Sequence, residues 1–325
     1  MRKYLTSMLT ALLCFLLIIV LNFLLPRMLP GDPIAYLTGM DEEAITPTQY
    51  ADYTEKLHLN DSLPKQFLWY LRSLADGTLG YSYQKEANVA SLIGTRLGAT
   101  LQIALPGVLL STLFGLLWGL RCGFRKGGIA DRIATPALVV LNSVPTFLIA
   151  LVLIALFCFQ NRWFPYTGLS APDVQPGTAA WFADRLHHLV LPVLTLTLAM
   201  TPSRFLLVRN TAAKISNEKY ILYAKERGLS PAKIRGAYLL RNMAQPFLTM
   251  TGMSVGACFG GSLVVENLFS VPGMGSLLTG AVYTLDYPLM QGILFVTTSV
   301  MLAAILLSDA LCILIDPRVR WGEQI

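Results

Sequence analysis

Few side chains in this sequence are of types and spacings that could do chemistry. His187 and His188 could bind a metal ion or transfer a proton near neutral pH. Residues adjacent in sequence do not share a helix face, so this pair alone makes a poor metal site and fits an interfacial position better. No C-x-x-C pair occurs among the five cysteines, which we expect to be small apolar packing residues: Cys14, Cys122, Cys158, Cys258 and Cys312. The sequence therefore predicts no metal site.

Motifs for phosphate or cofactor chemistry are absent from the sequence. It holds no G-x-x-x-x-G-K-[ST] phosphate loop, no G-x-G-x-x-G after a strand and no H-E-x-x-H. The apolar segments also lack the clustered ionisable residues of a proton or ion relay, and Asp309 is open to a structural or a functional role. We predict no catalytic and no cofactor-binding residue, so the chain is not expected to be an enzyme. Energy for uphill transport would come from another subunit.

The composition is that of an integral membrane protein. The chain has a mean hydropathy of +0.56 and only 14% charged residues, whereas about 25% is usual in soluble domains. Crossing a bilayer takes about 20 apolar residues. The first apolar stretch is too long for a signal peptide, so we expect it to be retained as a span. We predict six transmembrane helices: Leu5–Leu25, Thr100–Leu120, Ile133–Phe159, Leu189–Ser203, Met243–Val265 and Leu289–Leu307.

Basic residues determine the predicted orientation. Most of the 25 lysines and arginines lie in the segments 1–4, 121–132, 204–242 and 316–325. Cytoplasmic loops are enriched in lysine and arginine, so these segments and both termini are predicted to be cytoplasmic. The net charge of +6 then reflects membrane topology and requires no nucleic-acid partner.

The chain divides into three parts by its pattern of apolar and polar segments. Residues 1–98 hold the first span and a long extracytoplasmic segment, in which "ITPTQYADYTEKLHL" and "LPKQFLWYLRSLADG" show helical spacing. Residues 99–316 hold the remaining spans, and residues 317–325 form a cytoplasmic tail. After the fifth span, "ENLFSVPGMGSLLTGAVYTLDYPL" is too apolar for a free loop and too broken for a span. We expect a partly buried re-entrant element there.

Two short helices are predicted in the longest cytoplasmic segment. Ser216 or Asn217 is expected to cap the first, and Gly228 to end it in a left-handed conformation. Ser230 then caps a second helix that has Pro231 at its first position. Along the first helix, Tyr220, Tyr223 and Ala224 are expected on one face. Aromatic residues, a cap and a glycine stop favour a docking helix over a solvated connector.

Glycines recur every four residues in the fifth apolar stretch, at Gly252, Gly256 and Gly260. Small residues at this spacing let helices approach closely in lipid, so we predict a helix-packing stripe. Gly115 and Gly119 form a weaker version in the second stretch.

A family resemblance follows from the segment "KYILYAKERGLS", with "LLRN" and Pro246 after it. It resembles the cytoplasmic coupling motif of binding-protein-dependent ABC importer permeases, more narrowly the dipeptide, oligopeptide and nickel permease family. Further segments resemble that family in its order over nearly the whole chain: "LPGDP", "NSVPTFLIALVLIALF", "HHLVLPVLTLTLAM", "VVENLFSVPGMGSLLTGAV", "DYPLMQG" and "DPRVR".

The resemblance implies an all-α membrane protein with the type I ABC importer permease fold, in the cytoplasmic (inner) membrane of a bacterium or archaeon. It also implies a second homologous permease subunit, two cytoplasmic ATPases that carry ATP and magnesium, and an extracytoplasmic solute-binding protein. The coupling helix would rest in a groove of one ATPase, with Tyr220 or Tyr223 as the aromatic knob. The implied coupling residues are Tyr220, Tyr223, Ala224, Gly228, Leu229 and Ser230.

Some residues depart from the family's pattern. Glu226 reverses a charge within the usual coupling motif, and Ile305 stands where the family often has Asn. Such changes bear on the choice of partner. Short peptides are the first expected substrate, and nickel or a metal chelate is the alternative. A self-sufficient secondary transporter or channel, and a membrane-bound enzyme or scaffold, are the competing classes.

Overall fold

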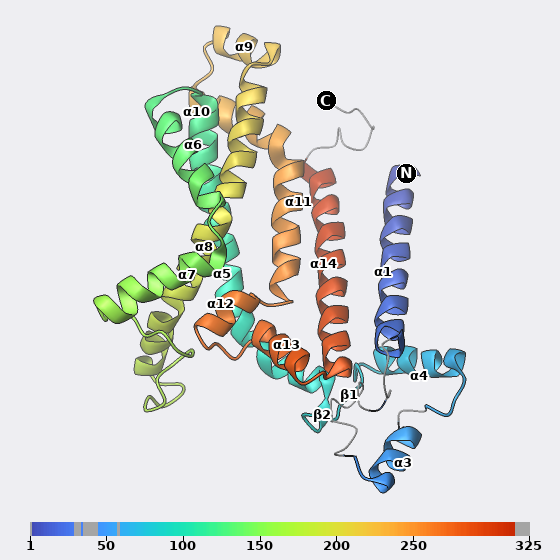
Figure 1. Cartoon of the computed structure of the whole chain (residues 1–325). Coiled ribbons are helices and arrows are strands. Elements are labelled where there is room, and N and C mark those ends of the chain that lie inside the picture. The colour runs from blue at the N-terminus through green and yellow to red at the C-terminus, as the bar shows by residue number, and fades with distance from the viewer. Residues whose placement is uncertain (1, 29–33, 35–44, 57–58, 316–325) are drawn as a thin grey trace. The chain divides into compact units, whose positions relative to one another are not determined.

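The computed structural model describes residues 2–28, 34, 45–56 and 59–315. The predicted cytoplasmic tail and the segments "LPGDP" and "DPRVR" lie outside these residues. Figure 1 shows a chain built almost entirely of helices, which agrees with the expected all-α class. A two-stranded antiparallel hairpin, β1 (Tyr81–Ser82) with β2 (Ala87–Asn88), is a small exception just before α5 (Val89–Phe124).

The described helices divide between two compact units, and each unit has its own packing. The first unit comprises residues 1–100, 259–263 and 272–300. The second comprises residues 101–258, 264–271 and 301–325. Helices α5 (Val89–Phe124) and α14 (Tyr287–Ile315) contribute to both.

The first unit includes α1 (Arg2–Met28), α3 (Pro47–Lys56), α4 (Leu63–Ala75) and α13 (Met274–Tyr283). The helices α3 and α4 confirm the two predicted from the apolar spacing of the segment after the first apolar stretch. The buried cluster of this unit joins the start of α5, α13 and the first half of α14: Val89, Ile93, Met274, Leu277, Ala281, Leu289 and Ile293. Within the segment predicted to be a partly buried re-entrant element, α13 is a short helix that packs on two others.

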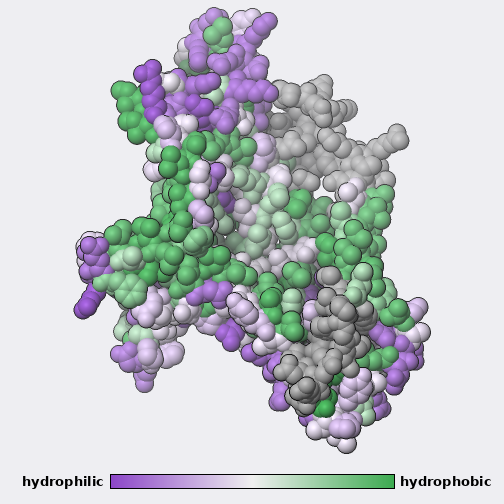
Figure 2. Space-filling view, in the orientation of Figure 1, coloured by the Kyte–Doolittle hydropathy of each residue, from purple (hydrophilic) through white to green (hydrophobic). Residues whose placement is uncertain are grey.

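The second unit contains α6 (Ile129–Asn142), α7 (Thr146–Ile154) with the π-helical turn η2 (Ala155–Gln160), and α8 (Ala179–Ser216). It continues through α9 (Lys219–Glu226), α10 (Pro231–Lys233), the π-helical turn η3 (Ile234–Leu240) and α11 (Arg241–Cys258). The short α12 (Leu263–Leu268) begins in the first unit and ends in the second. Figure 2 shows hydrophilic residues over α9 and α10 and hydrophobic residues over α7.

Three described helices, α5, α8 and α14, are long and apolar enough to cross a membrane. A fourth span results if α6 and α7 with η2 count as one, although they meet at 99°. The single helix predicted over Ile133–Phe159 is therefore two helices that meet at a bend. Pro145 lies at the bend and has no backbone N–H to continue the helix. Within α1, the stretch Leu12–Leu24 is apolar but shorter.

The helix predicted over Met243–Val265 ends early, at Cys258. Gly260 and Gly261 follow, and Gly261 has φ +82°, a conformation that glycine adopts without strain. Because the chain turns there, Val265 belongs to α12 instead of the long helix.

Close helix packing in the second unit depends on glycines of α5. A methyl group added at Gly115 would lie 2.6 Å from Cβ of Arg204, and one at Gly119 would lie 2.7 Å from Cβ of Val208. A methyl group added at Gly123 would lie 2.7 Å from Cβ of Ala212. The three glycines are four residues apart and form a stripe, which we call the α5 glycine stripe, that lets α8 approach the α5 backbone.

The glycines predicted to pack in α11 are placed differently from one another. A methyl group on Gly256 would lie 2.5 Å from Cα of Met301 in α14, and one on Gly252 would overlap the Ser308 hydroxyl. Gly260 lies beyond the end of α11 and is not part of this stripe, because the helix stops at Cys258.

Candidate functional site

The segment predicted to dock a partner forms a compact projection at the end of α8, which we call the α9 hairpin (residues 217–240). Figure 1 shows α9 at the extremity of the second unit, beyond the ends of α6, α8 and α10. The hairpin brings the predicted coupling residues together on two short helices and the turn between them: Tyr220, Tyr223, Ala224, Gly228, Leu229 and Ser230.

The start of α9 differs from the predicted one. Ser216 is the last residue of α8, and Asn217 caps that helix, with its backbone N–H donating to the carbonyl of Lys214 at 3.2 Å. Glu218 is the N-cap of α9 and makes no side-chain capping hydrogen bond. The expected capping role of Ser216 or Asn217 is wrong because these residues complete the preceding helix.

The end of α9 is the glycine stop that the sequence predicts. Gly228 has φ +74°, and its N–H donates to the carbonyl of Lys225 at 2.9 Å. Leu229 N–H donates to the carbonyl of Ala224 at 3.2 Å. These two bonds are those of a Schellman motif, in which a left-handed residue satisfies the last carbonyls of a helix. Leu229 also packs on the apolar cluster beneath the hairpin, so both backbone hydrogen bonds and side-chain packing fix the turn.

Ser230 begins the second helix as predicted. Its hydroxyl oxygen accepts from the backbone N–H of Lys233 at 3.3 Å, and Pro231 stands in the first turn. A proline is favourable there because the first N–H groups of a helix lack helical partners.

The inner face of α9 is apolar and buried. Ile221 and Ala224 lie in one cluster with residues of α8, η3 and α11, including Ile215, Ile234 and Met243. The expectation that Ala224 shares a face with both tyrosines is wrong, because Ala224 follows Ile221 by three residues and points inward with it. Ala224 therefore holds the hairpin to the rest of its own chain.

The outer face of α9 exposes large apolar side chains. Tyr220, Leu222 and Tyr223 are 38%, 56% and 61% exposed. The Tyr220 ring stacks on Tyr238 at 6.4 Å between centroids, and its hydroxyl accepts from the Asn242 amide at 3.2 Å. Tyr220 is thus held in place at its inner edge, whereas Tyr223 stands out from the surface. Exposed aromatic residues on a rigid short helix suit a protein interface, in which tyrosine is enriched.

An ion pair between a buried carboxylate and a partly exposed guanidinium ties the start of α6 to α8. The Arg209 guanidinium donates to both oxygens of Asp131, from Nε at 2.9 Å and from Nη2 at 2.8 Å. Asp131 also accepts from Thr135 Oγ1 and from the Gly127 N–H, each at 2.8 Å. Such a two-pronged pair fixes orientation as well as distance. Sequence reasoning missed it, although Asp131 is an acid within an otherwise basic turn.

A second cation, Arg204, lies inside the packed helices. It is 2% exposed and donates to Thr112 Oγ1 at 3.2 Å, to the Met200 carbonyl at 3.1 Å and to Ser254 Oγ at 2.8 Å. These bonds link α5, α8 and α11 through one side chain. The sequence placed Arg204 at the edge of a cytoplasmic segment, so its buried position was not foreseen.

The adjacent histidines make separate contacts. His187 Nε2 lies 2.8 Å from the Trp163 carbonyl, and His188 Nδ1 lies 2.9 Å from the Asp184 carbonyl. In the described part of the chain, no group of three His, Cys, Asp or Glu residues is arranged to hold a metal ion. The pair is accounted for by local hydrogen bonds.

Comparison with known proteins agrees with this architecture. The family model described as "Binding-protein-dependent transport system inner membrane component" matches residues 87–321. A probable peptide ABC transporter permease of Sinorhizobium fredii is 32% identical over 299 residues, which cover 92% of this chain and 93% of that protein. The di/tripeptide transport system permease DppB of Pseudomonas aeruginosa is 32% identical over 92% of this chain and 93% of its own length. The dipeptide transport system permease DppB of Escherichia coli is 28% identical over 94% of this chain and 95% of its own length. The chain, with its long apolar helices and its α9 hairpin, belongs to the family of binding-protein-dependent transport system inner membrane components.

Proposed function

We propose that this chain is a permease subunit that carries short peptides into the cell through an ATP-driven importer of the inner membrane. The proposed substrate rests on the names of the relatives, which state peptide, dipeptide or di/tripeptide transport. These relatives align over more than nine tenths of both chains. These names favour peptides over the nickel or metal-chelate alternative.

In this proposal six spans cross the membrane: α1, α5, the bent pair of α6 with α7 and η2, α8, α11 and α14. Both termini and the α9 hairpin are then cytoplasmic. The excess of lysine and arginine near the ends of α5 and α8 and through the hairpin supports that orientation.

The α9 hairpin is the proposed coupling element. Tyr220, Leu222 and Tyr223 would enter a groove of a cytoplasmic ATPase, because they form the exposed apolar part of the hairpin. Ile221, Ala224 and Leu229 would transmit the movement, because they pack inward on α8 and α11. Gly228 and Ser230 give the hairpin its fixed shape, through the left-handed turn and the cap.

The proposed cycle needs partners in addition to this chain. A second permease would complete the passage, two ATPases would bind ATP with magnesium, and a solute-binding protein would deliver the peptide outside. Closure of the ATPases would move both coupling helices and shift the spans between outward- and inward-open states.

Purification of the tagged full chain from native membranes under mild conditions tests the assembly. We expect a second permease, the ATPases and a binding protein to be recovered and identified by mass spectrometry. Uptake of labelled dipeptides and of nickel by cells with and without the chain then tests the substrate. Loss of nickel uptake with normal peptide uptake would overturn the proposed substrate and leave the importer assignment in place.

A further inference from the structure

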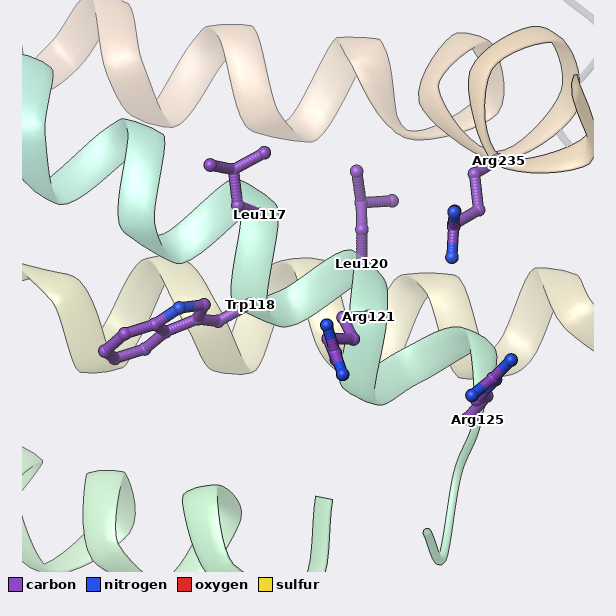
Figure 3. Close-up of a pocket in the computed structure, with 6 residues that line it drawn as sticks. All are labelled: Leu117, Trp118, Leu120, Arg121, Arg125 and Arg235. Atoms are coloured by element: carbon purple, nitrogen blue, oxygen red, sulfur yellow. The ribbon is translucent and has the colours of Figure 1, made fainter. Parts of the chain in front are cut away.

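A basic pocket lies on the flank of the second unit, where the end of α5 meets η3. It has a volume of about 470 Å³ and is lined by Leu117, Trp118, Leu120, Arg121, Arg125 and Arg235. Figure 3 shows Leu117 and Leu120 pointing from α5 toward the ribbon that carries Arg235, while the Arg235 side chain points back toward α5. We call this the arginine pocket. Three arginines, from the end of α5, the turn after it and η3, thus line a pocket that also has an apolar wall.

The charge of the arginine pocket is not neutralised within the described residues. No carboxylate lines it, and the ion pairs of the described part of the second unit involve other residues, Arg209 with Asp131 and His188 with Asp184. Arg235 lies over the Phe124 ring at 5.7 Å, which orients its guanidinium but supplies no negative charge. The pocket therefore offers three cations to an anion from outside the chain.

The shape of the required anion follows from the arginine side chains. A guanidinium presents a planar fork of N–H donors that matches the oxygens of a phosphate group. Arg121 lies in the last turn of α5, and Arg125 directly follows the helix, with its N–H donating to the Arg121 carbonyl at 3.4 Å, so the two residues are one turn apart on the same side. A phosphate held between them would also be within the field of Arg235.

An apolar path leads away from the arginines along α5. Leu113, Leu117 and Trp118 are 49%, 54% and 50% exposed, and Leu110 one turn further is 38% exposed. Trp118 packs against Phe114 with 5.8 Å between ring centroids. Tryptophan at the edge of an apolar helix, followed by arginines, is typical of the membrane interface. The apolar path therefore suits acyl chains, and the basic pocket suits an anionic headgroup.

We propose that the arginine pocket binds an anionic phospholipid of the cytoplasmic leaflet, with its phosphate on Arg121, Arg125 and Arg235 and its acyl chains along α5. The inference rests on the proposed function for its orientation, which puts this end of α5 at the cytoplasmic surface. Basic pockets between helices on that side bind anionic headgroups. The lipid would also support the base of the coupling element, because Arg235 belongs to the α9 hairpin.

The test measures lipids retained by the full chain with its co-purified subunits, after reconstitution into vesicles of equal phosphatidylcholine and phosphatidylglycerol. After mild detergent extraction, native mass spectrometry counts each bound lipid. We expect the wild type to retain phosphatidylglycerol in preference to phosphatidylcholine. The triple variant R121Q/R125Q/R235Q should lose about tenfold or more of that preference, since each basic residue near an anionic surface contributes about fivefold.

The matched control removes three cations from the same end of the unit outside the pocket, as K126Q/K214Q/K233Q. It should retain the wild-type preference, which separates a defined site from general attraction. R121K/R125K/R235K keeps the charge, so it reports on folding and should bind at an intermediate level. Equal preference in the triple variant and the wild type, or equal loss in the control, would overturn the proposal.

Two further outcomes would assign the pocket to another ligand. Displacement of the lipid by excess inorganic phosphate would mean that the pocket takes free anions. Loss of the ATPase subunits from the triple variant, with lipid retention unchanged, would mean that it contacts a protein. The assay does not depend on transport, so absent peptide uptake with intact lipid preference would overturn the proposed function alone.

Discussion

The α5 glycine stripe and the α9 hairpin belong to the same unit but are stabilised by opposite means. At the stripe, missing side chains let two long helices approach until Gly115, Gly119 and Gly123 contact α8 directly. At the hairpin, an apolar inner face and a Schellman turn hold a short helix whose outer tyrosines are exposed. The glycine stripe has no space for a larger side chain, whereas the hairpin exposes side chains that make few contacts within the chain. Substitutions should therefore affect stability in the stripe and partner binding in the hairpin.

The largest expected effect is that of Gly119→Leu. A Cβ there would lie 2.7 Å from both Cβ and Cγ1 of Val208, which is fully buried, and 3.0 Å from the Phe205 carbonyl. Overpacking of this kind costs about 3 kcal/mol or more when backbone atoms cannot move. We expect little folded protein, measured by size-exclusion chromatography and thermal unfolding in detergent.

Gly94→Leu in the same helix is the matched control, because a Cβ at Gly94 meets no atom within 4 Å. It should fold like the wild type. Similar losses in both variants would show that α5 tolerates no leucine for reasons unrelated to helix contact.

The second effect concerns the ion pair that joins α8 to α6. Asp131→Asn keeps the size of the side chain but leaves Arg209 without its counter-charge, and Asp131 is 4% exposed. Breaking a buried pair by changing one partner destabilises a protein by about 3 kcal/mol. The free energy of unfolding should fall by about that amount at most, because Arg209 keeps some exposure and water can partly solvate its unpaired charge.

Asp173→Asn serves as the control, because Asp173 is exposed in the same unit. The double variant D131N/R209M tests the coupling between the two residues. A double variant that is no more stable than D131N alone would show that the loss does not come from an unpaired arginine.

The sequence predicts features of these regions that depend on neighbouring residues, and it misses those that depend on packing between elements. Gly228 was found because a glycine after a charged helix and before Ser230-Pro231 has a well-defined local role. The inward direction of Ala224 was missed, because helical spacing shows which residues share a face but not which face meets the core. Ile221 decides that, and the other elements that contribute to its buried cluster are α5, α8, η3 and α11.

The bend between α6 and α7 shows a second limit. The apolar residues on both sides of Pro145 together have the length of one span, so hydropathy alone predicts one helix there. Arg204 shows a third limit, because its position at the end of an apolar run fits a cytoplasmic boundary equally well. Its burial depends on Thr112 and Ser254, which come from distant parts of the sequence. Non-local partners of this kind are not encoded in local patterns.

The third effect should appear in coupling and not in folding. Tyr223→Ala removes a side chain that is 61% exposed, so the free energy of unfolding should hardly change. If the α9 hairpin docks on an ATPase, loss of an aromatic anchor there should weaken binding by about 2 kcal/mol, or about thirtyfold. Peptide uptake should fall while ATP hydrolysis continues in the purified complex.

Tyr223→Phe keeps the ring and is the control for this change. It should retain most of the uptake. Normal uptake by Tyr223→Ala would remove the coupling role from this side chain, and a fall in the amount of folded chain would erase the contrast with the glycine stripe.

Gly228→Ala should lower stability by less than the changes in the glycine stripe and the ion pair do. Nothing lies within 4 Å of a Cβ at this position, so the penalty comes from the left-handed backbone alone, at about 1 kcal/mol. Gly228→Val should cost more, because a β-branched side chain is less tolerant of φ +74°. Gly236→Ala is the control, since its site is equally open and its φ is not positive.

Hydrogen exchange can locate that small penalty within the unit. The N–H groups of Gly228 and Leu229 are protected by the carbonyls of Lys225 and Ala224, so Gly228→Val should speed their exchange and that of α9. Exchange in α5 at the glycine stripe should stay at the wild-type rate, because the stripe glycines pack on α8 and a Cβ at Gly228 meets no atom within 4 Å. We expect Gly228→Val to insert normally but to lose coupling of ATP hydrolysis to uptake. Equal acceleration in α5 would mean that the hairpin is not an independent element, and its tyrosines could then no longer be assigned to partner binding separately from the stability of the whole unit.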